Sequence, residues 1–196
     1  MTGRTRRRGR DGSEPPPTGS AAHDVEPDQE SVARAIALRL LTSSARSRSQ
    51  LAEAMARKDV PDDVAQRVLD RFTEVGLIDD AEYARMVVRT RHAERGLSRR
   101  AIAVELRRRG IDDELAGEAL GQLDSDDEEV AARELVRRKL RATSGLDAQT
   151  RARRTFAALG RKGYPPGLVS RLVREELAAV GASGEDDVIE GPDLGL

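Results

Sequence analysis

Three segments of the chain align without gaps, and they decide its architecture: MARKDVPDDV at 55–64, LRRRGIDDEL at 106–115 and LGRKGYPPGL at 159–168. The first position of each segment is apolar, the third and fourth are basic, and the sixth and tenth are again apolar. The segments begin 51 and 53 residues apart. A period near 50 residues without strand patterns indicates tandem three-helix units stacked in a row.

Accidental similarity is the alternative, because short helices joined by tight turns resemble one another in any helical protein. The matching of both basic and apolar positions favours duplication. Strong helix formers dominate the intervening sequence, with Gly or Pro at intervals of roughly 12 to 20 residues. We therefore predict an all-α fold with helices at about 30–44, 48–58, 62–75, 80–94, 98–109, 113–122, 127–143, 148–162 and 166–179.

Capping patterns support several of these boundaries. Ser47 with Gln50, Asp79 with Glu82 and Ser125 with Glu128 have the spacing of reciprocal N-terminal caps. Glycine is favoured where a helix stops in a left-handed conformation, and seven glycines stand at such positions: Gly76, Gly96, Gly110, Gly121, Gly145, Gly163 and Gly181. We expect the core of the second unit to contain Tyr83, Val87, Ile102, Leu106, Ile111, Leu115 and Leu120.

The charge is unevenly distributed along the 196 residues. The chain holds 34 Lys and Arg residues against 35 Asp and Glu residues, but residues 181–196 are acidic and residues 1–30 are rich in Arg and Pro. This composition predicts disordered ends around a basic body. We expect a disordered tail at 1–29, repeats at 30–78, 79–123 and 124–180, and a disordered acidic tail at 181–196.

The composition argues against an enzyme. Cysteine is absent and the two histidines are far apart in sequence, which leaves no material for thiolate chemistry and little for a histidine metal site or a Ser–His triad. Phosphate-binding glycine loops are also absent. We expect no catalytic residues, no metal and no cofactor. No window of 18 uncharged apolar residues occurs, so we expect a cytoplasmic protein without a membrane partner.

Arginine clusters form the candidate binding surface. Aromatic residues are only 2% of the chain, too few for a platform that stacks bases, so nucleic-acid contact must depend on charge. Stacked units would align the basic residues in a stripe suited to phosphates or to an acidic partner. The stripe contains Arg99, Arg100, Arg107, Arg108, Arg109, Arg133, Arg137, Arg138, Arg141, Arg151, Arg153, Arg154, Arg161 and Lys162. The alternative is a solvated face with intrahelical pairs such as Glu134 with Arg138.

Three segments resemble the RecX regulatory proteins of bacterial recombination: ALRLLTSSARSRSQLAEAM at 37–55, GLIDDAEYARMVVRTR at 76–91 and GLSRRAIAVELRRRGI at 96–111. The most specific part is similar to the family signature at Asp79, Asp80, Tyr83 and Ala84. The third unit matches more loosely. The resemblance covers about residues 31–179, and it implies an elongated, curved array of tandem three-helix repeats.

The resemblance implies a target. Members of that family bind the helical filament that the RecA recombinase forms on single-stranded DNA, and they restrain its growth, ATP hydrolysis, strand exchange and coprotease activity. The resemblance therefore implies RecA and single-stranded DNA as partners, weaker contact with duplex DNA, a monomer, and roles in homologous recombination, DNA repair and the SOS response.

Two other functions remain open on the residues alone. A three-helix unit with a tight turn is also the plan of helix-turn-helix proteins that bind specific DNA sequences. Asparagine is absent, however, and arginine-rich faces suit phosphates better than base discrimination. The other open function is that of a helical adaptor that binds only protein.

Overall fold

The computed structural model describes residues 28–185, and every regular element in that range is an α-helix. The predicted nine helices are present in the described range. Their bounds are α1 (Gln29–Ser43), α2 (Arg48–Ala56), α3 (Asp62–Glu74), α4 (Asp80–Arg95), α5 (Arg99–Arg108), α6 (Asp113–Leu120), α7 (Ser125–Arg141), α8 (Ala148–Arg161) and α9 (Pro166–Glu185). Residues 1–27 and 186–196, which contain most of both predicted tails, lie outside the described residues.

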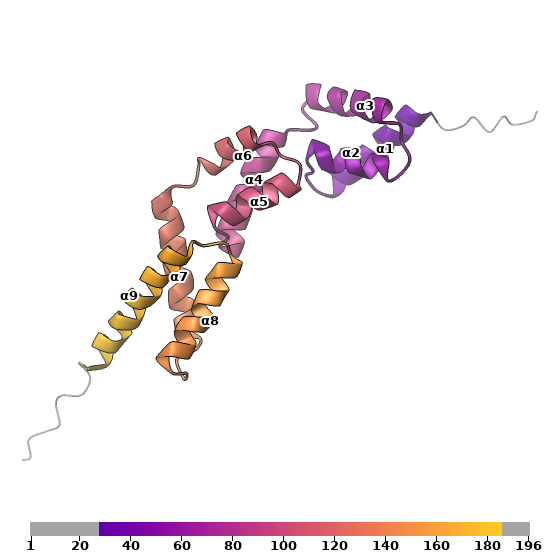
Figure 1. Cartoon of the computed structure of the whole chain (residues 1–196). Helices are drawn as coiled ribbons and strands as arrows, with labels where there is room; N and C mark the ends of the chain where they lie inside the picture. Colours follow the sequence, from indigo (N-terminus) through magenta and orange to yellow (C-terminus); the bar gives the residue numbers. More distant parts are fainter. Residues whose placement is uncertain (1–27, 186–196) are drawn as a thin grey trace, which may run out of the picture.

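The helices form three units in a row (Figure 1). Unit 1 contains α1 to α3, unit 2 contains α4 to α6, and unit 3 contains α7 to α9. Figure 1 shows unit 2 between the other two, which gives the described part of the molecule an elongated outline. The predicted all-α repeat fold is therefore confirmed.

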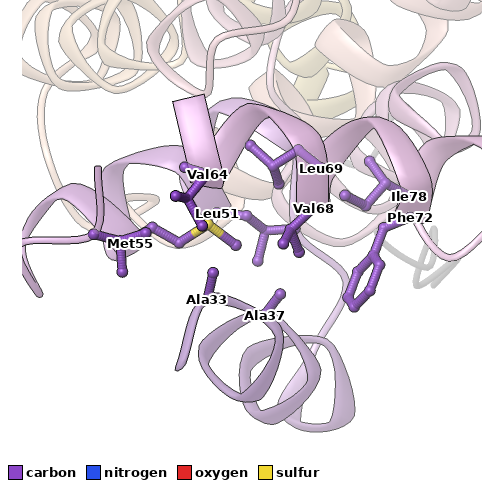
Figure 2. Packing of buried hydrophobic residues seen from close by; sticks show 11 residues of the cluster. Ala33, Ala37, Leu51, Met55, Val64, Val68, Leu69, Phe72 and Ile78 are labelled. Atoms are coloured by element: carbon purple, nitrogen blue, oxygen red, sulfur yellow. The ribbon is translucent and has the colours of Figure 1, made fainter. Parts of the chain in front are cut away.

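Each unit closes its own small apolar core. In unit 1, Leu51 and Met55 from α2 pack between Ala33 and Ala37 of α1 and the side chains of α3 (Figure 2). Because Ala33 and Ala37 are small, α1 can approach α2 and α3 closely. All seven residues predicted for the core of unit 2 belong to its apolar cluster, although Leu115 is only partly buried.

Of the three predicted reciprocal caps, one is confirmed in both directions and a second in one direction. Ser47 and Gln50 form a capping box, and the Asp79 carboxylate accepts a hydrogen bond from the Glu82 amide at 2.8 Å. The predicted cap at Ser125 is wrong by one residue. Asp124 caps α7 instead, because its carboxylate reaches the amide of Asp126 and makes Ser125 the first helical residue.

Four of the seven glycines have the predicted left-handed conformation: Gly76, Gly96, Gly110 and Gly163. Gly121 is right-handed, and Gly145 is not among the residues with positive φ. Gly181 lies inside α9, which continues to Glu185, so the predicted helix end there is also wrong. A glycine permits a left-handed stop but does not impose one, and α9 continues in the right-handed conformation.

Adjacent units meet at a joint, in which the N-terminal end of the second helix of one unit packs on the turn between the second and third helices of the next. At joint 1 the buried hydroxyl of Ser47, at the start of α2, donates to the Arg109 carbonyl oxygen at 2.5 Å. The Arg48 amide donates to the Asp80 carboxylate at 2.8 Å. Unit 2 thus satisfies polar groups that would otherwise be unpaired at the end of α2.

Joint 2 repeats this arrangement between units 2 and 3. The Ser98 amide, at the start of α5, donates to the Lys162 carbonyl oxygen at 3.0 Å. The Arg99 amide donates to the Glu128 carboxylate at 3.0 Å. In the repeat, Ser98 is equivalent to Ser47 and Lys162 to Arg109, so one joint design is used twice.

The turn residue at each joint must be glycine. Gly110 has φ 74°, and a Cβ there would lie 2.1 Å from the Cβ of Ser49. Gly163 has φ 85°, and a Cβ there would lie 2.6 Å from the Ser98 hydroxyl. The equivalent position in unit 1, where no described unit packs on the turn, is the exposed Asp59 with φ 58°. The close approach, added to the positive φ, excludes every other residue at the joints.

We predict that Gly110→Ala lowers the free energy of unfolding by at least about 2 kcal/mol, because it combines left-handed strain with overpacking against Ser49. Urea denaturation followed by circular dichroism measures the change. Gly117→Ala is the matched control, since Gly117 lies inside α6 with nothing near its Cβ position. The control is expected to stabilise the helix slightly. Equal effects of the two substitutions would contradict the close approach at the joint.

Candidate nucleic-acid and partner interface

The structure divides the fourteen predicted cations into three groups. Arg107, Arg109, Arg133 and Arg137 form ion pairs. The second group donates side-chain hydrogen bonds to backbone carbonyl oxygens and consists of Arg99, Arg151 and Lys162. Seven are exposed and form no ion pair with described residues: Arg100, Arg108, Arg138, Arg141, Arg153, Arg154 and Arg161. The expected pair of Glu134 with Arg138 is not formed.

Arg109 is a structural residue of joint 1. Its guanidinium is 2.5 Å from the Glu105 carboxylate, donates to the Tyr83 hydroxyl and lies 5.9 Å from the centre of the Tyr83 ring. Burial lowers its pKa, but the hydrogen bonds with Tyr83 and Glu105 outweigh that effect and raise the pKa overall. Arg109 is therefore a poor candidate for a phosphate ligand.

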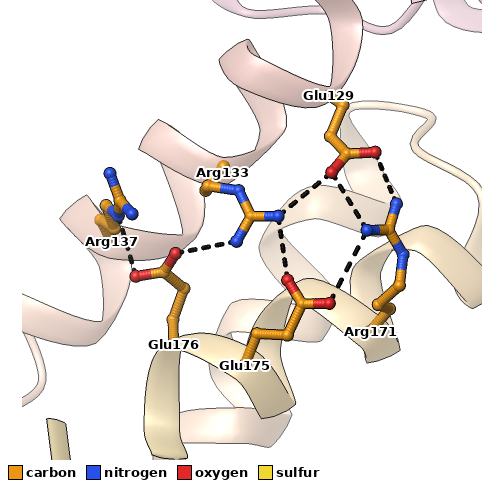
Figure 3. A network of polar contacts seen from close by, with 6 residues as sticks. All are labelled: Glu129, Arg133, Arg137, Arg171, Glu175 and Glu176. Atoms are coloured by element: carbon orange, nitrogen blue, oxygen red, sulfur yellow. Dashed lines mark hydrogen bonds and ion pairs between the residues drawn. The ribbon is translucent and has the colours of Figure 1, made fainter. Parts of the chain in front are cut away.

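Arg133 and Arg137 belong to a network of ion pairs between carboxylates and guanidinium groups (Figure 3). Glu176 of α9 is buried and accepts from Arg133 at 3.1 Å and from Arg137 at 2.8 Å. Glu129 and Arg171 extend the network, with their closest atoms 2.5 Å apart. These contacts fix α7 against α9, so the two predicted binding residues stabilise unit 3.

The buried carboxylate at the centre of the network is held in its charged form. The Arg137 guanidinium donates to Glu176 and lowers its pKa, and Arg133 acts in the same direction against the opposing effect of burial. Removing the Glu176 charge would leave Arg133 and Arg137 near each other without their shared partner. The network therefore contributes to the stability of unit 3 only while Glu176 is ionised.

A cluster of positive charge forms at joint 2 from residues of α4, of α7 and of the turn after α8. Burial lowers the pKa of Lys162, and so does the positive charge of Arg138, Lys139 and Arg95. The Lys162 ammonium also donates to the Arg95 carbonyl oxygen. Sequence reasoning missed Arg95, although its place directly before Gly96 at a predicted helix end was visible. This joint-2 cluster suits an anion such as a phosphate.

Exposed cations also recur at equivalent positions of successive units. Arg57, Arg108 and Arg161 occupy the third position of the aligned segments, and all three are exposed. Arg100 and Arg153 are a second equivalent pair in units 2 and 3. Because both joints are built alike, equivalent positions are related by a similar displacement from unit to unit. The row Arg57, Arg108 and Arg161 therefore follows the long direction of the molecule.

The four signature residues belong to unit 2 and mainly build joint 1. Asp79 caps α4, and Asp80 accepts from the Arg48 amide of unit 1. The buried Tyr83 accepts from Arg109 and donates to Gln50 at 3.1 Å. Ala84 is fully buried in the core. Tyr83 and Tyr164 are both buried, so neither ring is exposed for stacking on bases.

The described residues contain no group of three or more His, Cys, Asp or Glu side chains arranged to hold a metal ion. Within residues 28–185, no helix is long and apolar enough to span a membrane.

Comparison with known proteins assigns all three units. Models of the first, second and third three-helix domains of RecX match residues 33–72, 79–120 and 126–173. The regulatory protein RecX of Thermobifida fusca is 51% identical over 89% of this chain and 92% of its own length. The regulatory protein RecX of Streptomyces coelicolor is 49% identical over 86% of this chain and 90% of its own length.

A solved structure shares the fold. The crystal structure of RecX from Lactobacillus salivarius superposes with a TM-score of 0.66 at 22% sequence identity, and the match covers 76% of this chain and 96% of that one.

We predict that Glu176→Gln lowers the free energy of unfolding at pH 7 by about 1–2 kcal/mol through the loss of two charge-assisted hydrogen bonds. The folded-state pKa of Glu176 lies below its ordinary value of 4.5, so its contribution is complete above that pH and disappears as the pH falls through the folded-state pKa. Urea denaturation between pH 7 and 3 is expected to show a smaller difference between variant and wild type at the acidic end. Glu114→Gln, an exposed control on α6, is expected to change little.

Proposed function

The chain belongs to the RecX family of regulatory proteins, and from this premise we propose that it binds the RecA filament on single-stranded DNA. In this proposal the molecule lies in the filament groove and restrains ATP hydrolysis, strand exchange and coprotease activity. The observation that carries the proposal is the recurrence of an exposed cation at the same position of each unit, in Arg57, Arg108 and Arg161.

A repeating molecule is suited to a repeating target. Successive units present similar surfaces at regular intervals, so several weak contacts on one stiff body combine into a high overall affinity. The exposed arginines and the joint-2 cluster would contact phosphates or acidic filament loops, which makes the affinity strongly dependent on salt. Inhibition then follows from occupying the groove and linking neighbouring protomers, and it needs no catalytic residue.

The proposed partners are RecA and single-stranded DNA, with weaker contact to duplex DNA. We propose that the protein acts as a monomer in the cytoplasm. Its biological setting would be homologous recombination, DNA repair and the SOS response. RecA in the filament would provide the protein contacts, and the DNA backbone would provide the contacts that depend on salt.

Recognition of a specific duplex sequence has less support. Helix-turn-helix proteins read bases with the N-terminal residues of the helix that follows the turn. At that position α3 begins with Asp62 and Asp63, and α6 begins with Asp113 and Glu114. These carboxylates would repel phosphates. In unit 2, moreover, the turn itself is covered by unit 1 at joint 1.

We predict that the triple variant Arg57→Ala, Arg108→Ala, Arg161→Ala binds RecA-coated single-stranded DNA at least about tenfold more weakly than wild type. The slope of log affinity against log salt is expected to become shallower by up to about 2 if all three contact phosphates. Fluorescence anisotropy with labelled DNA at several salt concentrations measures both effects, and inhibition of RecA ATP hydrolysis is expected to weaken in parallel.

The triple variant Arg34→Ala, Arg67→Ala, Arg71→Ala is the matched control. It removes the same charge from exposed arginines that lie outside the row. Each of them has a local carboxylate partner, as Arg57 of the row has in Glu53. It is expected to bind within about threefold of wild type. An equal loss in both variants would show that net charge alone matters. Wild-type protein that preferred bare strand, or one duplex sequence, over the coated strand would refute the proposal.

A further inference from the structure

A hollow of about 530 Å³ lies between α1 and α2 in unit 1, at the end of the row. Its apolar surface comes from Ile36, Leu40 and Ala54. Its charges come from Arg39, Lys58 and Arg57, and the last of these is paired with Glu53 at 3.6 Å. Arg57 is also a member of the exposed row Arg57, Arg108 and Arg161, whereas Arg39 and Lys58 are not.

The other two units use the equivalent surface to receive their neighbour. In unit 2 the positions equivalent to Leu40 and Lys58 are Arg91 and Arg109, which line a hollow together with residues 44–46 of unit 1. In unit 3 the equivalent of Lys58 is Lys162, which contacts residues 95–98 of unit 2. In unit 1, the described residues that line this surface all belong to unit 1 itself, so no described residue of another unit covers it.

The two occupied surfaces define the shape of the occupant. At each joint the covering element is the N-terminal end of a helix that begins at a buried serine, either Ser47 or Ser98. In both cases this serine donates a hydrogen bond to the turn carbonyl, of Arg109 or Lys162. The equivalent acceptor in unit 1 is the Lys58 carbonyl, and no donor from the described residues reaches it.

The charge of the hollow defines the chemistry of the occupant. At joint 1 the Glu105 carboxylate neutralises both Arg91 and Arg109. Unit 1 has Ala54 at the position of Glu105, and Arg39 and Lys58 form no ion pair with described residues. An occupant that fits the hollow must therefore bring its own carboxylates.

We propose that the hollow between α1 and α2 is a docking site for an acidic helix N-terminus of a partner protein. The partner helix would begin with a serine whose hydroxyl or backbone amide donates to the Lys58 carbonyl oxygen, as Ser47 and Ser98 do at the two joints. Carboxylates in its first turn would face Arg39 and Lys58. Unit 1 would thus bind a partner protein through the same kind of contact that links the three units to one another.

A pair of peptides tests this proposal. The natural peptide has the sequence of residues 96–109, which begins with the N-terminal end of α5, and the acidic peptide carries Arg99→Glu and Arg100→Glu. Both are labelled with a fluorophore and titrated with the full chain in anisotropy measurements at low and moderate salt. The acidic peptide is expected to bind at least tenfold more tightly than the natural one. Neither titration contains DNA or RecA, so the outcome is independent of filament binding.

Charge reversal locates the site. The Arg39→Glu, Lys58→Glu variant is expected to lose the preference for the acidic peptide, whereas the control Arg67→Glu, Arg71→Glu on α3 is expected to keep it, with circular dichroism confirming that both fold. Equal affinity for the two peptides, or a preference that survives reversal at Arg39 and Lys58, would overturn the proposal. It would also be overturned if a single-stranded oligonucleotide displaced the acidic peptide from wild type, since the hollow would then bind nucleic acid.

Discussion

The joint between units is the contact on which the arrangement of the molecule depends. Each three-helix unit closes a core of its own, but the orientation of one unit on the next is set by a serine at a helix start, a carbonyl in a turn and a glycine that permits close approach. These groups are polar and tightly packed, so the joint has little freedom to slide. The result is a stiff row in which equivalent positions recur at a regular spacing.

The same joints determine which positive charges are available to a partner. Arg109 lies inward at joint 1, where Glu105 and Tyr83 satisfy it, whereas at joint 2 the equivalent Lys162 adds to Arg138, Lys139 and Arg95. One acidic residue makes the difference, because unit 3 has Ala158 at the position of Glu105. Two joints of similar geometry thus differ in electrostatic character, and only the second presents an uncompensated positive cluster.

Sequence periodicity was sufficient to predict the helices, the repeat and the core of unit 2, because apolar spacing and capping are local properties. It was insufficient for the candidate site. Arg133, Arg137 and Arg108 look alike in sequence, yet the first two are bound to Glu176 and the third is exposed, and this distinction depends on how α7 packs on α9. Gly110 and Asp59 also align, and only the structure shows that a neighbouring unit covers one of them.

The long separation between the partners at joint 1 affects how the chain is completed during synthesis. Ser47 bonds to a carbonyl 62 residues further along the chain. At a translation rate of about 5–20 residues per second, roughly 3–12 s pass between the two residues. The first unit can close its core in that interval, while the polar start of α2 remains hydrated until the second unit emerges and covers it. Folding during synthesis therefore proceeds from unit 1 to unit 3, and each new unit docks on the unit before it and covers the polar start of that unit's second helix.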